Sequence, residues 1–248
     1  MPDPDPRIVL LAGASGLVGT NALDVLLDAP DTGRVFAITR RPLGREHPRL
    51  ANRIAQFDTL ETQLKGMTCH VAVCCLGTTL RQAGSEAAFR RVDVDYVLSF
   101  ARAAKAAQAQ RFIVVSSAGA DAQSKNFYLR TKGEMEEAVA GVGFVSLDIL
   151  QPGPLLGLRS QMRPLELGAL LVMPLVNPFL RGARGALRGI SAKTVGTAIV
   201  GAMRSGRRGV QRYTFDGIEA LSRLKSVRTV PLVDPKMSHA ARQRRDFE

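Results

Sequence analysis

Tyr128 and Lys132 stand four residues apart in a stretch that predicts a helix over residues 127–139, so both are expected on one face of it. A free tyrosine has a pKa of about 10 and exchanges protons poorly at neutral pH. A neighbouring ammonium group favours the phenolate and lowers that pKa, which turns the pair into a usable general acid/base. The alternative is a tyrosine and a lysine on an exposed helix face without a chemical role.

Ser116 and Ser117 are further candidates for a chemical role. An apolar run over residues 112–116 predicts a strand; Ser116 ends this strand and Ser117 comes directly after it. Ligands of open α/β sheets bind at the carboxyl ends of the strands. A hydroxyl group at this edge can hydrogen-bond a substrate oxygen while negative charge builds on that oxygen.

The glycines of the segment after residues 7–12 are spaced as GxxGxxG. Gly13 permits a tight turn, Gly16 lets the backbone approach a pyrophosphate, and Gly19 lets the next helix, expected over residues 17–27, pack closely on the strand. The N-terminus of that helix directs free N–H groups at the anion. The alternative is an ordinary glycine-rich loop. The residues expected to bind the dinucleotide here are Gly13, Ser15, Gly16, Leu17 and Gly19.

Arg40 and Arg41 follow the second expected strand, over residues 34–39. NAD-binding proteins carry an acid about 20 residues after the glycine turn, where it bonds the ribose 2′-hydroxyl. No carboxylate stands at this point of the sequence, and two guanidinium groups would meet a ribose 2′-phosphate, a strong and directional pairing. The sequence therefore favours NADP(H) over NAD(H), the alternative being that the two arginines only solvate a loop.

Strand and helix patterns alternate along the chain, which predicts parallel βαβ units with right-handed crossovers. The prediction is an α/β fold, a Rossmann-type doubly wound parallel sheet in a single domain over residues 1–248. Residues 154–190 break the rhythm and are expected to form a substrate-side insertion, and residues 231–248 a loosely held tail. The remaining strands are expected near 54–57 and over 71–76, 144–150 and 212–215, and the remaining helices over 86–109 and 192–203.

The composition, with 46% hydrophobic and 23% charged residues, excludes a long disordered or fibrous chain. The formal net charge of +12 comes with only 5% aromatic residues and no recognised nucleic-acid motif, so nucleic acid is not an expected partner. Cys69, Cys74 and Cys75 lie in one apolar stretch and, with three scattered histidines, offer no zinc set, so no metal is expected. Neither a signal peptide nor a membrane span is expected, and the predicted location is the cytoplasm.

The glycine turn, the two serines and the Tyr128–Lys132 pair together resemble the short-chain dehydrogenase/reductase superfamily. More specific segments resemble its atypical branch, the HIV Tat-interacting protein oxidoreductases and their bacterial relatives. These segments are residues 74–79, 91–96 and 116–121. The resemblance covers nearly the whole chain up to about Gly217.

This resemblance implies an NADP(H)-dependent oxidoreductase that transfers a hydride between nicotinamide and a small carbonyl or alcohol substrate. Tyr128 would be the acid/base, Lys132 would bind the nicotinamide ribose and lower the tyrosine pKa, and Ser117 would orient the substrate. Ser116 is the second candidate for that last role, and Gln151 stands where the family often has arginine. The further cofactor contacts that the resemblance implies are Asp58, Leu76, Gly77, Thr78, Pro152 and Gly153.

Two other functions stay open: an NADP(H)-binding regulatory protein without turnover, and a nucleotide-sugar epimerase or dehydratase, for which the chain is short. Monomer and homodimer are both compatible with the resemblance. The apolar residues 165–180 would line an apolar pocket, make a subunit contact or pack as a covering helix. Arg181, Arg184 and Arg188 would bind an anionic substrate or solvate a loop, and His47 and His70 receive no role.

Overall fold

The computed structural model describes residues 6–156 and 187–224. In this part of the chain a seven-stranded sheet has the order β3-β2-β1-β4-β5-β6-β9, and every neighbouring pair is parallel. The predicted Rossmann-type fold is confirmed. The strands are β1 (Arg7–Ala12), β2 (Thr32–Thr39), β3 (Leu50–Ile54), β4 (Val71–Cys74), β5 (Arg111–Val115), β6 (Ser146–Leu150) and β9 (Gly209–Tyr213), with a separate pair of β7 (Leu155–Leu156) and β8 (Ile190–Ser191).

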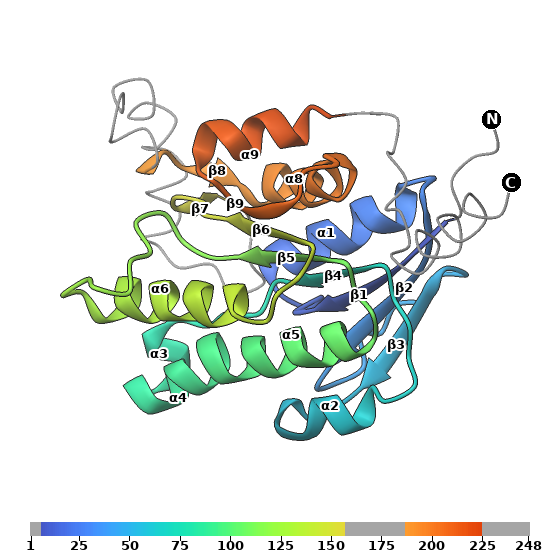
Figure 1. Ribbon diagram of the computed structural model, residues 1–248, viewed down its shortest axis with the longest axis horizontal. Helices are drawn as coiled ribbons and strands as arrows, with labels where there is room; N and C mark the ends of the chain where they lie inside the picture. The colour runs from blue at the N-terminus through green and yellow to red at the C-terminus, as the bar shows by residue number, and fades with distance from the viewer. Residues whose placement is uncertain (1–5, 157–186, 225–248) are drawn as a thin grey trace, which may run out of the picture.

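Helices cover both faces of the sheet (Figure 1). One face carries α1 (Leu17–Asp28), α8 (Ala192–Arg204) and α9 (Phe215–Ser222), and the other carries α2 (Leu60–Gln63), α5 (Tyr96–Ala106) and α6 (Phe127–Ala140). Side chains alternate along the central strand: Val9 and Leu11 belong to the first core and Leu10 to the second. Burial on both faces explains why this strand reads as a continuous apolar run.

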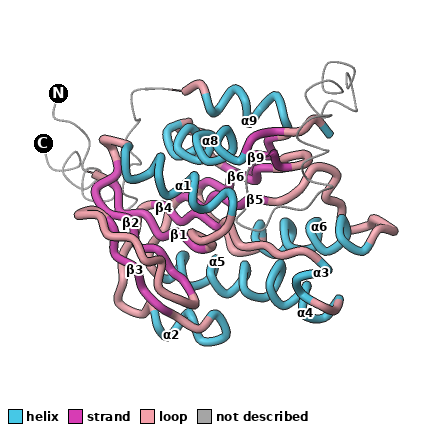
Figure 2. The backbone as a smooth tube through the Cα atoms, turned by 180° about the vertical axis from the view of Figure 1, so that it is seen from behind, coloured by secondary structure: helices cyan, strands magenta, loops and turns pink. Residues whose placement is uncertain are grey.

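The strand order reverses at β1, which lies between β2 and β4 (Figure 2). Chain segments leaving β1 and β4 therefore diverge, and a crevice opens outside their carboxyl ends, where doubly wound sheets bind ligands. The glycine turn follows β1, and residues 75–79 follow β4. The fold thus brings two of the predicted cofactor-binding segments to one edge.

The third strand corrects the sequence prediction, because it spans Leu50–Ile54 and not residues 54–57. Polar residues in this segment made the strand hard to predict. Asn52 donates to Ala37 O at 3.0 Å and to Thr39 Oγ1 at 2.7 Å, so the neighbouring strand β2 supplies the hydrogen-bond partners of this polar side chain. The apolar Phe57 is buried beyond the strand, in the short helical turn Phe57–Thr59.

The predicted helix over residues 86–109 is interrupted. It consists of α4 (Glu86–Arg90), a π-helical turn (Arg91–Asp95) and α5, which ends at Ala106. Such π turns occur often at functional sites, because they turn a side chain out of the regular helical series. The predicted last strand is also displaced, since β9 ends at Tyr213 and residue 215 begins α9. The short α3 (Leu80–Ala83) precedes α4.

The three thiols lie around the central strands. Cys69 and Cys74 are buried, and burial raises the pKa of each thiol to about 12, so both are inert apolar neighbours at neutral pH. Across the described ranges, no helix has the length and apolar character needed to cross a bilayer.

Candidate active site

The glycine turn between β1 and α1 has no room for side chains. Gly13 has a φ of +81°, and a Cβ there would lie 2.5 Å from the carbonyl carbon of Cys75. A Cβ on Gly19 would lie 2.0 Å from Gly13 O. Gly16 is the N-cap of α1 and supplies no side-chain acceptor, so the first N–H groups of α1 are left for an anion. The tight turn places the exposed Ser15 and the first N–H groups of α1 at the carboxyl end of β1, where they could bind an anion.

Lys132 is buried on α6, one turn after Tyr128, and forms an ion pair with Asp93, whose Oδ1 lies 2.6 Å from the lysine Nζ. Burial by itself would lower the pKa of Lys132, but attraction to Asp93 and to the Tyr128 hydroxyl raises it above the usual value. The lysine therefore stays a cation at neutral pH. A Cβ on Gly77 would lie 3.7 Å from this Nζ, so the segment after β4 passes directly beside the cation.

Asp93 reaches this point because it sits in the π-helical turn between α4 and α5. Its other oxygen, Oδ2, accepts the backbone N–H of Thr78 at 2.8 Å. One carboxylate thus ties Lys132 to the loop that contains Leu76, Gly77 and Thr78, the residues predicted to line the cofactor. Asp93 is the functional residue that sequence reasoning missed, although a charged residue four positions after the buried Phe89 and four before the buried Val97 was a usable signal.

Tyr128 begins the helix at the same edge. Asn126 caps α6 by accepting the N–H of Leu129 at 3.1 Å, which fixes where the helix starts. The Tyr128 ring packs on the buried Phe89, with 5.7 Å between ring centroids. Within residues 6–156 and 187–224 the Tyr128 hydroxyl has no hydrogen-bond partner, so it is available to a ligand.

The two serines at the end of β5 differ in their environment. Ser116 is buried and donates its hydroxyl hydrogen to Glu136 Oε1 at 2.6 Å. Ser117 is half-buried, and its hydroxyl has no partner in the described part of the chain. The loop that follows returns to α6, where Asp121 N–H donates to Leu129 O at 3.1 Å. Ser117 and Tyr128 therefore come from the two ends of one closed loop.

The implied adenine contact, Asp58, lies just after β3 and is exposed. Its Oδ1 accepts from Arg91 at 2.9 Å, and its Oδ2 accepts from the Tyr96 hydroxyl at 3.3 Å. The Arg91 guanidinium also lies over the Tyr96 ring, 5.7 Å from its centroid. The carboxylate of Asp58 is thus already held by two side chains of the helix beneath it.

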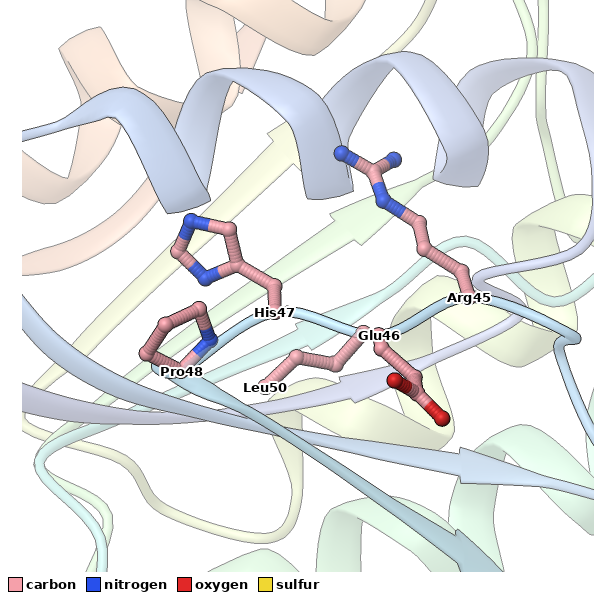
Figure 3. A pocket seen from close by; sticks show the side chains of 5 residues that line it. All are labelled: Arg45, Glu46, His47, Pro48 and Leu50. Atoms are coloured by element: carbon pink, nitrogen blue, oxygen red, sulfur yellow. The ribbon is translucent and has the colours of Figure 1, made fainter.

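The arginines after β2 fall into two groups. Arg45 forms an ion pair with Asp24 of α1, and Arg49 donates to backbone carbonyls around the end of α1, including Ala29 O at 3.0 Å. Figure 3 shows Arg45 pointing toward α1 above a shallow pocket that is lined by Arg45, Glu46, His47, Pro48 and Leu50. Arg40 and Arg41 are exposed and have no ion pair among the described residues.

Pro152 and Gly153 follow β6 and stay attached to the end of β5, because Ala118 N–H donates to Pro152 O at 2.9 Å. The predicted insertion lies largely outside the described residues, including 165–180, Arg181 and Arg184. Arg188 is described and lies over the Phe215 ring at 5.3 Å.

The two histidines that received no role each accept a backbone hydrogen bond. His47 Nδ1 accepts from Arg49 N–H at 3.1 Å, and His70 Nδ1 accepts from Ile8 N–H at 2.9 Å. Both therefore have a structural partner that the sequence did not reveal.

The sequence of this chain is similar to those of known proteins. A family model described as HIM1 matches residues 50–170. Protein HTATIP2 of Rattus norvegicus is 40% identical over 164 residues, which are 64% of this chain and 67% of that protein. Protein FMP52, mitochondrial, of Candida albicans is 31% identical over 211 residues, which are 80% of this chain and 89% of that protein. The chain belongs to the HTATIP2/FMP52 family. The resemblance to the atypical short-chain dehydrogenase/reductase group is thereby confirmed.

Solved structures of other proteins share the fold of this chain. MoeE5 in complex with UDP-glucuronic acid and NAD matches with a TM-score of 0.62 at 19% identity, covering 85% of this chain and 76% of that chain. UDP-glucose 4-epimerase of Thermotoga maritima with UDP-glucose matches with a TM-score of 0.63 at 12% identity, covering 88% and 81%. At such identities the likeness shows the Rossmann fold, which is that of NAD(P)-binding proteins.

Proposed function

We propose that this protein is an NADP(H)-dependent oxidoreductase that transfers a hydride between nicotinamide C4 and the carbonyl or alcohol carbon of a small substrate. One observation carries the proposal: a buried lysine, Lys132, is held as a cation one helical turn from Tyr128, whose hydroxyl is free among the described residues. A structural tyrosine and lysine on an exposed helix face, the alternative reading, would not leave the lysine buried.

The cofactor fits the residues present. Gly13 and Gly19 let the turn pack tightly against the segment after β4 and against α1, and a pyrophosphate would bind the free N–H groups at the N-terminus of α1. Arg40 and Arg41, which have no ion pair among the described residues, suit a 2′-phosphate. The other residues proposed to hold NADP(H) are Ser15, Gly16, Leu17, Asp58, Leu76, Gly77, Thr78, Tyr128, Lys132, Pro152 and Gly153. When bound, NADP(H) supplies or accepts the hydride.

Residues of the chain itself supply and accept the proton of the reaction. In the direction of reduction, the Tyr128 hydroxyl gives its proton to the substrate oxygen as the adjacent carbon is reduced, and the resulting phenolate is stabilised by Lys132. Ser117 donates a hydrogen bond to the same oxygen, which strengthens as charge builds there. Ser116 is a poorer candidate, since its hydroxyl is committed to Glu136.

The test combines binding with turnover. Saturable NADPH uptake and NADPH oxidation with a panel of aldehydes, ketones and quinones are measured for the wild type and for Tyr128→Phe. We expect Tyr128→Phe to lower turnover by a factor of about 100 or more, the range of general acid/base catalysis, while NADPH affinity stays within about threefold. Phe127→Leu, which alters the neighbouring aromatic ring, is the control. The absence of saturable binding by folded wild type would refute the proposal.

A regulatory protein without turnover is the second candidate, and a specific contact favours it. Asp93 offsets the charge of Lys132, the very cation needed to acidify Tyr128. Saturable NADPH binding with no oxidation across the whole panel would favour this function. A third reading, a nucleotide-sugar epimerase or dehydratase, predicts uptake of a UDP-sugar, which calorimetry detects directly.

We also propose that the chain forms one domain and acts on a small-molecule substrate. The protein would be a monomer or a homodimer in the cytoplasm. The Candida albicans relative is named as a mitochondrial protein, which is a different compartment. Fractionation of cells expressing the chain, and sedimentation of the purified protein, decide location and oligomeric state.

A further inference from the structure

Glu136 is a buried carboxylate that the proposed mechanism does not use. Its side chain accepts four hydrogen bonds from three residues on three different strands or strand ends. Ser116 Oγ donates to Oε1 at 2.6 Å, Gln151 Nε2 donates to Oε1 and Oε2 at 2.9 and 3.1 Å, and Arg212 Nε donates to Oε2 at 3.0 Å. A carboxylate only accepts, and every group that faces it here is a donor.

The position of Glu136 relates this cluster to the candidate active site. Tyr128, Lys132 and Glu136 follow each other at spacings of four on α6, so they share one helical face. The donors come from the end of β5, the end of β6 and from β9. Glu136 therefore joins the helix that carries the acid/base to the strand ends that carry Ser117 and the Pro152–Gly153 loop.

Backbone contacts reinforce the same edge. Gln151 N–H donates to Tyr213 O at 2.8 Å, and Ala118 N–H donates to Pro152 O at 2.9 Å. Side-chain bonds from Glu136 and backbone bonds from β9 and the β5 end thus converge on Gln151 and Pro152, at the start of the segment that the proposed function places over the nicotinamide.

We propose that Glu136 is a positioning residue of the active site. Its carboxylate turns the Ser116 hydroxyl inward, which leaves Ser117 to face the substrate, and it fixes Gln151 so that the Pro152–Gly153 loop lies at a set distance from Tyr128. The inference rests on the proposed NADP(H) site.

The test uses two ligands that differ only in the nicotinamide ring, which 2′-phospho-ADP-ribose lacks. Calorimetric titrations of the whole chain with NADPH and with 2′-phospho-ADP-ribose are compared for wild type and Glu136→Gln. The variant loses the negative charge and one acceptor oxygen: an NH₂ in place of Oε2 faces the Arg212 donor, and an NH₂ in place of Oε1 forces the Ser116 hydroxyl and the Gln151 amide to turn round. We expect NADPH affinity to fall about tenfold and 2′-phospho-ADP-ribose affinity to stay within about twofold.

Exchanging the carboxylate of Glu136 and the amide of Gln151 should restore NADPH affinity. In the double variant Glu136→Gln with Gln151→Glu, an amide on α6 faces a carboxylate on β6, and net charge is unchanged. NADPH affinity should return to within about threefold of wild type. The matched control is Asp148→Asn, because Asp148 is equally buried on the other side of β6, where it binds Arg111 at 2.6 Å and Tyr213 at 3.1 Å. This change should lower thermal stability and leave both affinities unaltered.

Equal weakening of both ligands by Glu136→Gln, or weakening of neither, would overturn the inference while leaving the proposed function intact. If Glu136→Gln does not fold, Gln151→Met removes one donor from the cluster at nearly constant volume and is titrated in the same way. A folded wild type that binds neither ligand would refute the proposed function and this inference together.

Discussion

Lys132 Nζ lies 2.6 Å from Asp93 Oδ1, and the two side chains are only 6% and 0% exposed. Removing two charges from water costs several kcal/mol, which their attraction offsets only with good geometry and further hydrogen bonds. Asp93 meets this requirement through the N–H of Thr78. The pair keeps Lys132 charged and fixed beside Tyr128, and it links α6 to the loop after β4.

Replacement of the anion should therefore be costly. Asp93→Asn leaves a buried cation without its partner, and we expect the free energy of unfolding at pH 7 to fall by about 3 kcal/mol. Asp95→Asn, an exposed position in the same π-helical turn, is the control and should change stability by less than about 0.5 kcal/mol. Urea unfolding followed by circular dichroism measures both.

The pH dependence of this deficit has a defined sign. In the wild type the pKa of Lys132 is raised above 10.5, so the pair stabilises the fold fully below that pH and loses its effect as pH rises through the folded value. In Asp93→Asn burial dominates and lowers the lysine pKa. The difference in stability should be largest near neutral pH, shrink as pH rises through the lowered lysine pKa of the variant, and shrink further above 10.5 as the wild type loses the pair. A deficit that grows with pH would contradict this account.

Cofactor preference should depend on two arginines of the β2–β3 connection and not on its total charge. The double change Arg40→Ala, Arg41→Ala is expected to weaken NADPH by about 30-fold or more and NADH by less than about threefold, because only NADPH has a 2′-phosphate. Arg45→Ala removes a charge from the same loop, but that guanidinium is bound to Asp24, so both affinities should hold. Equal losses for the two coenzymes would defeat the preference.

The closeness of the glycine turn to α1 makes Gly19 intolerant of any side chain. A methyl group on Gly19 would lie 2.0 Å from Gly13 O, so either the helix or the turn must move. We expect Gly19→Ala to cost about 2 kcal/mol of stability and to weaken NADPH at least about tenfold. Gly141→Ala, at a helical φ of −63° with ordinary contacts, is the control and should be neutral or stabilising. Thermal unfolding and calorimetry report the two effects.

Acid stability should be sensitive to Asp31, which lies between Arg204 and Arg7. Burial raises the pKa of this carboxyl, but the hydrogen bond and charge of Arg204 outweigh it and lower the pKa below 3.8. A lowered carboxyl pKa adds stability above the unfolded value, and that stability is lost as pH falls through the folded value. Asp31→Asn should cost about 1 kcal/mol at pH 7, after allowance for partial exposure, and progressively less as pH falls below 3.8. Asp28→Asn, an exposed acid with no ion pair in the described chain, should show no such dependence.

The sequence alone determined the fold class, the glycine turn and the spacing of Tyr128 and Lys132 on one helix. These features are local: a strand–turn–helix with glycines at fixed spacing, and Tyr128 and Lys132 one turn apart, are legible because neighbours in the chain decide them. The bounds of β1 and the start of α6 were predicted correctly.

Only the tertiary structure decided which polar groups are engaged. Asp93, Ser116 and Arg45 bind residues far along the chain, whereas the side chains of Ser117 and Arg41 have no such partner among the residues that the structure describes. The position of β3 was likewise hidden, because its polar side chain is satisfied by a neighbouring strand. The physical reason is the same in each case: periodicity and propensity act over a few residues, while the partner of a buried charge or hydroxyl is chosen by the packing of distant elements.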